Sequence, residues 1–309
     1  MISVESMDFR QLQALIAIAD HGSFSAAASA LHTVQSNISS HVARLEKELG
    51  VQLVDRQGSN LTEEGQAVVE RGRRVAAELE AAVADVAALR HEVVGTAKIG
   101  MIGTTARWLG PLLLDGMSLA HPKVRLLIGD GTSATLQPHL ASGSLDAAVV
   151  NLPQSNPDLI ERPLFEEDLL LVVPTDHPIA GKTEIALADL DDLELLLPAP
   201  GTVFRAEIDE ACRVAGVNLR PRAEVDGVRL MTSLALQGYG PAILPASGVG
   251  DGLTGFTRVS VSGLPCRRVG VVLRRRGRPS APARALLETL EKVVNANLDT
   301  RRGVHAPSS

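Results

Sequence analysis

The sequence predicts an α/β protein with an all-α N-terminal region. Short apolar stretches at helical spacing fill residues 7–62, and a longer apolar repeat with steps of four and three runs through residues 62–93. From residue 96 onward, short apolar runs alternate with helical stretches, as in an α/β fold with a mostly parallel sheet. The 309 residues also exceed one typical domain of about 100–200 residues, so several domains are expected.

The composition is that of a globular protein with a sizeable core. Hydrophobic residues make up 45% of the chain and charged residues 21%. The two cysteines, Cys212 and Cys266, are too few for a disulfide framework and favour a reducing cytoplasm. Neither a signal-peptide pattern nor a run of about 18 apolar residues is found, so no membrane partner is expected.

Two helices are expected before residue 32. Apolar side chains recur at helical spacing over residues 9–19, and Gly22-Ser23 interrupts them. Ser23 is the expected N-cap of a second helix over residues 24–31.

A third helix is expected after a tight turn at His32-Thr33, with Thr33 as its N-cap and Gly50 at its end. Its apolar residues fall on one face: Ile38, Val42, Leu45 and Leu49. Two short helices joined by such a turn are the arrangement of a helix-turn-helix, whose second helix enters the major groove of DNA by its N-terminal end.

The polar first turn of this third helix is the candidate for base recognition. Gln side chains can bond adenine in a bidentate manner, and Ser can bond several bases. The face opposite the apolar residues contains Gln35, Ser36, Ser39, Ser40 and Arg44. The alternative is that these are ordinary capping and solvent-facing residues.

The string from Phe9 to Gly65 resembles the N-terminal domain of LysR-type transcriptional regulators. The shared features follow in order: an opening helix, GSF-x-x-AA, the Leu31 turn, a Q-S-x-x-S helix, an R-L-E-x-E-L-G end, a strand-like wing and L-T-x-x-G. The resemblance extends over nearly the whole chain. It implies a winged helix-turn-helix in residues 1–65 that binds double-stranded DNA. In it, Gln35, Ser36, Ser39 and Ser40 would contact bases, and Arg44 and Arg56 would contact phosphate or support the fold.

Positive charge is scarce in this region. Residues 1–65 hold four basic side chains against eight acidic ones, the reverse of a usual DNA-binding domain. Many family members carry Arg at the position of Ser40 and a longer, basic wing where this chain has Gln57–Asn60. We therefore expect weak non-specific affinity, with specific binding dependent on dimers or tetramers.

Residues 66–95 are expected to form a linker helix. The apolar repeat from Val68 to Val93 is an a/d seam with a weak point at Gly72, and such a seam predicts pairing between two copies of the chain. The alternative is one long helix packed on its own domain. The expected dimerisation residues are Val68, Val75, Leu79, Ala82, Val86 and Leu89. The family resemblance further implies a homotetramer and a contact with RNA polymerase.

Seven apolar runs in the remainder predict strands buried on both faces. They are Lys98–Ile102, Val124–Ile128, Ala147–Leu152, Leu169–Pro174, Leu193–Leu197, Ala242–Leu244 and Val269–Leu273. The resemblance implies that residues 96–298 form a periplasmic-binding-protein-like effector domain. Its subdomains would be 96–162 with 266–298, and 163–265, with crossings near Glu161–Pro163 and Gly263–Arg268. Residues from Asp299 onward are expected to form a loose tail.

Small donor residues follow three of the expected strands, just before expected helices. Ligands of open α/β sheets bind beyond the carboxyl ends of strands, and helix N-termini favour anions, so a small carboxylate is the expected effector class. For any single threonine, a simple N-cap is the alternative. The candidate effector residues are Thr104, Thr105, Thr132, Ser133 and Thr202, with Phe204 and Val228 as an apolar wall.

The sequence offers little for other functions. Gly181-Lys182-Thr183 lacks the upstream glycine of a P-loop, the histidines show no metal spacing, and no cofactor or catalytic constellation is expected. The basic run Arg274–Arg278 is expected to be a solvated loop. Cys212 and Cys266 are expected to be buried structural thiols rather than a redox switch. A ligand-responsive regulator is thus favoured over an α/β enzyme, and a solute-binding protein would leave the first 95 residues unexplained.

Overall fold

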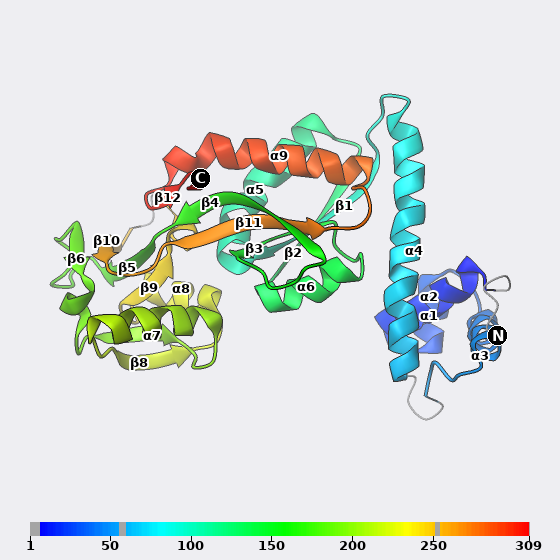
Figure 1. Ribbon diagram of the computed structural model, residues 1–309, viewed down its shortest axis with the longest axis horizontal. Helices are drawn as coiled ribbons and strands as arrows, with labels where there is room; N and C mark the ends of the chain where they lie inside the picture. The colour runs from blue at the N-terminus through cyan, green and yellow to red at the C-terminus, as the bar shows by residue number, and fades with distance from the viewer. Residues whose placement is uncertain (1–6, 56–59, 251–253, 309) are drawn as a thin grey trace. The chain divides into compact units, whose positions relative to one another are not determined.

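The computed structural model describes residues 7–55, 60–250 and 254–308 (Figure 1). The chain divides into two compact units. The N-terminal unit comprises Met1–Glu92 with the short segment His139–Leu145, and the C-terminal unit comprises Val93–Pro138 with Asp146–Ser309.

Three helices form the core of the N-terminal unit: α1 (Phe9–His21), α2 (Phe24–Ala30) and α3 (Gln35–Leu49). Ser23 caps α2 as expected, because its Oγ accepts the Ala26 N–H at 3.1 Å. Gly22 and Gly50 take positive φ values of 73° and 71° and end α1 and α3. The predicted order of helices and their stop signals are therefore confirmed.

The start of α3 differs from the expectation by one residue. Val34, not Thr33, occupies the N-cap position and makes no side-chain hydrogen bond there. The Thr33 hydroxyl instead accepts a hydrogen bond from Asn37 Nδ2 at 2.9 Å. His32 has a φ of 52°, in the left-handed region, so the turn between the helices is as tight as predicted.

A wing segment and a long helix complete this unit. Val54 and Leu61 form an isolated antiparallel bridge. Helix α4 (Glu63–Ala88) then begins at Thr62, whose hydroxyl accepts the Gly65 N–H at 3.0 Å. Val68 and the bridge residues pack with the side chains that α1, α2 and α3 bury, which include Leu15, Ile18, Ala27, Ile38, Val42 and Leu45. The first turns of α4 therefore belong to the domain core.

Gly72 is a close approach between helices rather than a gap in a seam. A Cβ at this position would lie 3.2 Å from Ile16 Cδ1 on α1, and Gly72 is buried. Helix α4 ends at Ala88, so Leu89 is its C-cap residue and Val93 lies beyond it. The regular helix therefore stops before the predicted repeat does.

The C-terminal unit contains two six-stranded sheets. The first has the order β12-β4-β11-β3-β1-β2, from β1 (Gly95–Ile102), β2 (Val124–Gly131), β3 (Ala147–Leu152), β4 (Leu159–Glu167), β11 (Arg267–Arg274) and β12 (Val304–His305). With helices α5 (Gly103–Ala120), α6 (Ser133–Ala141) and α9 (Ala281–Asn297), we call it subdomain I. Helix α9 packs against α5 and against β1.

The second sheet has the order β6-β10-β5-β9-β7-β8. Its strands are β5 (Leu169–Pro174), β6 (Glu184–Ala186), β7 (Glu194–Pro198), β8 (Arg220–Val225), β9 (Ala242–Pro245) and β10 (Phe256–Ser262). Helices α7 (Val203–Ala215) and α8 (Val228–Leu236) pack with it, and we call this part subdomain II.

All seven predicted strands are present, but both sheets are mixed rather than mostly parallel. Strand β11 is antiparallel to β3 and β4, and β5 is antiparallel to β9 and β10. The strands that sequence patterns did not predict are β4, β6, β8, β10 and β12. Strand β8, for example, is exposed over most of its length, so it has no continuous apolar run.

The chain crosses between the two subdomains twice. Strand β4 stays in the first sheet up to Glu167 and β5 begins at Leu169, so the first crossing is at Asp168, beyond the expected Glu161–Pro163. The return lies between β10 and β11, at residues 263–266, within the expected range. We call these two crossings together the junction. The long strands β4 and β11 run side by side into it (Figure 1).

The C-terminal residues are not a loose tail. Short helix η4 (Leu298–Thr300) leads into β12, which pairs with β4 through Val304 and Glu167. The main-chain N–H of Asp168 also donates to the Gly303 carbonyl at 2.8 Å. The prediction failed because a two-residue edge strand has no apolar period to reveal it.

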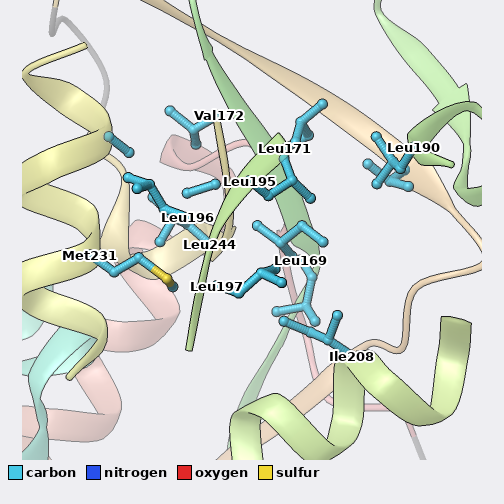
Figure 2. Close-up of a cluster of buried hydrophobic side chains, with 14 of the residues drawn as sticks. Leu169, Leu171, Val172, Leu190, Leu195, Leu196, Leu197, Ile208, Met231 and Leu244 are labelled. Carbon is cyan, nitrogen blue, oxygen red and sulfur yellow. The ribbon is translucent and has the colours of Figure 1, made fainter. Parts of the chain in front are cut away.

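Leucine and valine side chains fill the core of subdomain II (Figure 2). Leu169, Leu171 and Leu244 lie on neighbouring strands β5 and β9, and Ile208 reaches them from α7. This packing holds α7 on the sheet and so fixes the loop that precedes it.

Candidate functional site

The recognition face of α3 is exposed as the sequence predicts. Ile38, Val42 and Leu45 are at most 2% exposed and point into the core. The opposite face carries exposed side chains throughout: Gln35, Ser36, Ser39, Ser40 and Arg44. Since these side chains face solvent, their hydroxyl and amide groups are available to base edges. Arg56, the other predicted DNA contact, lies outside the described residues, as do Gln57–Ser59 of the wing.

Helix α4 carries an apolar face that the described part of the N-terminal unit leaves uncovered. Val75 is 44% exposed, Leu79 47% and Val86 58%. Ala82 and Leu89 are exposed as well, and so is Val83. Val68, in contrast, is half-buried against the core of the unit. The uncovered face therefore consists of five of the six predicted dimerisation residues together with Val83.

Helix α5 begins at the carboxyl end of β1, where the sequence predicts an anion site. Its N-cap residue, Ile102, makes no side-chain hydrogen bond, so the first N–H groups of the helix lack a side-chain cap. Thr104 and Thr105 follow at once and are 5% and 0% exposed. The Thr105 hydroxyl is buried and has no hydrogen-bond partner among the described residues. The start of α5 thus combines a helix dipole with a hydroxyl that no described group satisfies.

Subdomain II meets the start of α5 through the short helix η3 (Ala246–Gly248). A Cβ at Gly248 would lie 2.9 Å from Thr104 Cγ2 and 3.8 Å from Thr232 Oγ1, so only a glycine permits this approach. Ser247 is 1% exposed, and its hydroxyl also lacks a partner in the described part of the chain. Two unsatisfied buried hydroxyls, those of Thr105 and Ser247, therefore lie on elements that touch.

The other predicted threonines have local partners. Thr132 Oγ1 accepts the Thr135 N–H at 3.2 Å, and both residues are exposed next to the half-buried Ser133. Thr202 Oγ1 donates to the Ala199 carbonyl at 2.9 Å and accepts the Arg205 N–H at 3.2 Å. Both hydroxyls thus act as caps, the alternative that the sequence left open.

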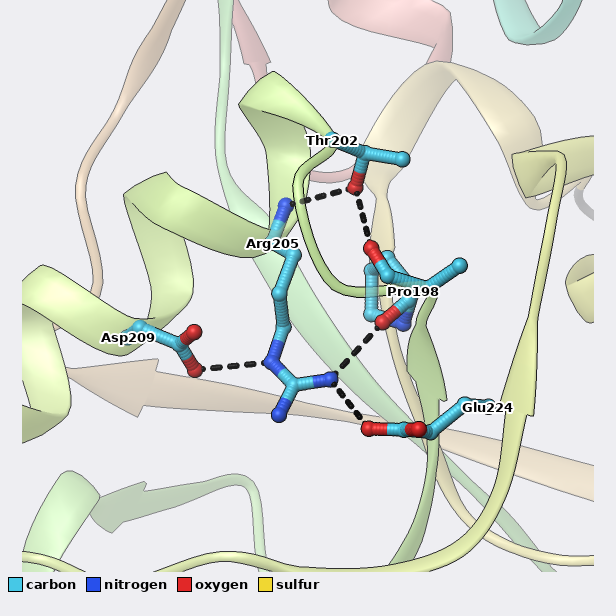
Figure 3. A network of polar contacts seen from close by, with 6 residues as sticks. Pro198, Thr202, Arg205, Asp209 and Glu224 are labelled. Carbon is cyan, nitrogen blue, oxygen red and sulfur yellow. Dashed lines mark hydrogen bonds and ion pairs between the residues drawn. The ribbon is translucent and has the colours of Figure 1, made fainter.

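Arg205 holds the Thr202 loop in place (Figure 3). Its guanidinium donates to the Pro198 carbonyl at 2.9 Å, to Glu224 Oε1 at 2.9 Å and to Asp209 Oδ1 at 2.8 Å. These contacts tie the first turn of α7 to the ends of β7 and β8. The hydrogen bonds of Arg205 therefore hold the loop in one conformation, and the Thr202 hydroxyl is already used within it.

Phe204 and Val228 both belong to the packing of subdomain II. Phe204 is 7% exposed, and the Arg267 guanidinium carbon lies 5.0 Å from its ring centroid. Val228 is half-buried against the same core. Phe204 therefore lies beside a charged group at the junction, which the sequence did not predict.

A charged cluster occupies the junction. Glu167 is fully buried, and its Oε2 accepts the Ser247 N–H at 2.9 Å. Arg267 Nη1 lies 3.9 Å from Glu167 Oε1, and Arg267 Nε lies 3.5 Å from Glu207 Oε2. Burial raises the pKa of the Glu207 carboxyl, the charge of Arg267 lowers it, and the charge of Glu167 raises it further. No sequence motif marks this cluster, because its members come from three distant segments.

Two more polar residues at the carboxyl edge of the first sheet escaped prediction. Asn151 lies near the end of β3, and its Oδ1 is buried without a hydrogen-bond partner among the described residues. Arg229 of α8 pairs with Asp130 at the end of β2, with 2.7 Å between Nη1 and Oδ2, and so joins the two subdomains. The rule that found Thr104 would have found Asn151, since both follow buried strand residues.

The cysteines differ from the expectation in part. Cys212 is buried as predicted, but Cys266 is exposed, because it lies in the crossing segment between β10 and β11. Burial raises the pKa of both thiols. Negative charges raise it further, from Asp209 at Cys212 and from Asp168, Glu166 and Glu167 at Cys266.

Within the described part of the chain, no cluster of His, Cys, Asp and Glu side chains could hold a metal ion. Over the same residues, no helix has an apolar stretch of the length that a bilayer crossing requires.

The N-terminal unit has an exposed recognition helix, and the C-terminal unit has two α/β subdomains with a candidate ligand site at the start of α5. These features are typical of a regulator that binds DNA and a small molecule. Two family models match this division. The bacterial regulatory helix-turn-helix protein model of the lysR family covers residues 9–66, and the LysR substrate binding domain model covers residues 90–295. The chain therefore belongs to the LysR family of DNA-binding transcription regulators.

Individual members of this family match the chain over most of its length. The DNA-binding transcriptional dual regulator OxyR of Escherichia coli K12 is 30% identical over 302 residues, which are 95% of this chain and 96% of that protein. The probable hydrogen peroxide-inducible genes activator of Streptomyces viridosporus is 31% identical over 85% of this chain and 87% of its own.

Solved structures show the same architecture. A full-length variant of OxyR from Pseudomonas aeruginosa aligns with a TM-score of 0.72 at 25% identity, over 93% of this chain and 97% of that one. Full-length CbnR complexed with its target DNA aligns with a TM-score of 0.67 at 26% identity, over 93% and 100%. An N-terminal helix-turn-helix domain and a two-subdomain α/β effector domain, the predicted fold, are thereby confirmed.

Proposed function

We propose that this regulator reads its operator through Gln35, Ser36, Ser39 and Ser40, with Arg44 on phosphate. The exposed polar face of α3, opposite a fully buried apolar face, is the observation that carries this assignment.

We further propose that the regulator acts as a homodimer through the uncovered face of α4, and as a tetramer when bound to DNA. Contact with RNA polymerase and location in the cytoplasm, where its operator would be, stay predictions.

Fluorescence anisotropy with the DNA upstream of its own gene tests the assignment. Replacing Gln35 and Ser39 with Ala should weaken specific binding at least about tenfold, because base-edge contacts supply about 1–3 kcal/mol each. Binding to unrelated DNA should change little. Ser29→Ala is a matched control, since this exposed α2 serine donates to its own helix at the Ser25 carbonyl. Equal losses on both DNAs would show that α3 does not read sequence.

The effector site that the geometry favours lies at the start of α5, beside its contact with η3. The N-terminal N–H groups of α5, which no side chain caps, and the Thr104 and Thr105 side chains suit an anionic group, so a small carboxylate is the proposed effector class. Replacing Thr105 with Val removes the hydroxyl without changing the shape, and should abolish the effector response while leaving operator binding intact. A loss of operator binding instead would contradict this division of roles. We assign the site a sensing role rather than catalysis, since hydroxyls and helix N–H groups bind anions without a base to activate them.

Hydrogen peroxide is the second candidate signal, because relatives are named as hydrogen peroxide-inducible genes activators. Peroxide reacts with thiolates, and their fraction falls as a thiol pKa rises. Both thiols of this chain have raised pKa values. We therefore propose that this regulator does not sense peroxide through Cys212 or Cys266. Operator binding should be the same before and after peroxide, in the wild type and in a Cys212→Ser, Cys266→Ser variant. A peroxide effect that this variant loses would reverse the conclusion.

A further inference from the structure

Buried polar atoms without hydrogen bonds gather at one place in the C-terminal unit. Among its described residues, six side chains carry such an atom: Thr105, Asn151, Glu167, Glu207, Ser247 and Arg267. Proteins rarely leave such atoms unpaired, since each costs about 1–3 kcal/mol. All of these except Asn151 lie at the junction or at the adjoining start of α5, and this concentration points to a ligand.

The charged members of this group are linked by short contacts. Arg267 lies between the two carboxylates, 3.9 Å from Glu167 Oε1 and 3.5 Å from Glu207 Oε2, yet within the described residues those two oxygens accept no hydrogen bond. Glu167 and the Arg267 side chain are at least nine-tenths buried. The three groups are thus close enough to bind one shared partner, but they are too far apart to form hydrogen bonds with one another.

The cluster has a net charge of −1 when both carboxylates are ionised, because one guanidinium faces two of them. Withdrawing a carboxylate from water is costly, and burial is the largest cause of the raised pKa of Glu207, whose side chain is 30% exposed. A ligand that adds one positive charge and several N–H donors would neutralise the cluster and satisfy both free carboxylate oxygens. A protonated primary amine has these properties.

The cluster is continuous with the anion site at α5. Ser247 donates its N–H to Glu167, and the next residue, Gly248, meets Thr104. One peptide unit therefore separates the carboxylate cluster from the helix N-terminus. A molecule of a few bonds between its charged ends could reach both.

We propose that Glu207 and Glu167 bind a protonated amino group of the effector, so that the effector is a small amino-carboxylate zwitterion rather than a simple carboxylate. This inference rests on the proposed effector site at α5. The carboxylate end meets the start of α5, and the amino end meets the cluster. The Phe204 ring lies beside the cluster, with its centroid 5.0 Å from the Arg267 guanidinium carbon.

Calorimetric titration of the full chain with the twenty standard amino acids tests this. Each amino acid is compared with its N-acetyl derivative and with the carboxylic acid that lacks the amino group. At least one amino acid should bind, and both analogues should bind about tenfold more weakly or worse, because a charge-assisted hydrogen bond is lost. This comparison uses the wild-type chain, so it does not depend on a variant folding.

Glu207→Gln should remove the preference for the amine while the acid without the amino group binds as before. Glu210→Gln is the matched control, since Glu210 lies on the same helix, is exposed and pairs with Arg213. Amine and amine-free ligands that bind equally, or no amino acid that binds at about 10 mM, would overturn the inference. If simple carboxylates bind the wild type and Thr105→Val abolishes that binding, the effector site at α5 is supported and only the inference of an amino group fails.

Discussion

At the scale of single residues, Gly65 explains the end of the L-T-x-x-G pattern. A Cβ at Gly65 would lie 2.0 Å from the Leu53 carbonyl oxygen, closer than any real contact. That carbonyl already accepts the Thr62 N–H at 3.0 Å, and the Thr62 hydroxyl caps α4. The wing therefore crosses the start of α4 so closely that only glycine fits there.

Gly65→Ala should accordingly destabilise the N-terminal unit by about 2 kcal/mol or more, since backbone rather than a flexible side chain must move. Gly72→Ala is the matched control on the same helix. Its Cβ would meet the movable Ile16 Cδ1 at 3.2 Å, and alanine gains about 1 kcal/mol in helix propensity, so its stability should stay near that of the wild type. Urea unfolding followed by circular dichroism measures both. Similar losses in the two variants would refute the account of Gly65.

Single residues also show where sequence reasoning reached its limit. Local chemistry was predictable: Ser23 as a cap, Gly50 as a stop and the polar face at Gln35 all depend on neighbours within a few positions. The cluster of Glu167 and Arg267 was not, because a long stretch of sequence separates its members and no period links them. Thr202 lies between these cases. Its position was predicted, but its hydroxyl is used by its own turn.

At the scale of elements, the C-terminal segment acts as a strap across the junction. Arg301 Nη1 donates to the Ser247 carbonyl of subdomain II at 3.1 Å, and its guanidinium carbon lies 5.2 Å from the Trp108 ring centroid of subdomain I. Trp108 in turn packs edge-on against Phe165 of β4, with 5.1 Å between ring centroids. One residue thus contacts both sides of the proposed effector site.

Arg301→Ala should lower the stability of the C-terminal unit by about 2 kcal/mol, from the lost cation–π contact and hydrogen bond. A melting temperature several degrees lower in a thermal scan is the expected result, with a weaker effector response. Arg276→Ala, in the exposed loop after β11, is the control and should melt like the wild type. If the two variants melt alike, the strap has no role in holding the subdomains together.

At the scale of the whole molecule, charge and assembly determine how the protein holds DNA. Each recognition domain has four basic side chains, Arg10, Arg44, Lys47 and Arg56, so a pair of domains offers about eight to phosphate. The logarithm of the binding constant should then fall against the logarithm of salt concentration with a slope no steeper than about −7. Anisotropy titrations between about 50 and 200 mM salt measure this slope. A slope near about −10 would require cations beyond those of the two recognition domains.

With so few phosphate contacts, affinity must come from joining two recognition helices, and the uncovered face of α4 is the surface available for that. Leu79 is 47% exposed there, so Leu79→Glu would place two carboxylates in a dimer seam. Analytical ultracentrifugation should show half the mass of the wild-type assembly, and operator affinity should fall at least about tenfold, because the second half-site no longer benefits from linkage. Leu79→Met keeps the volume and the apolar character, so it should retain both mass and affinity. A Leu79→Glu variant that remains dimeric and binds its operator fully would place the dimer interface elsewhere, and α4 would then be a spacer between the two units.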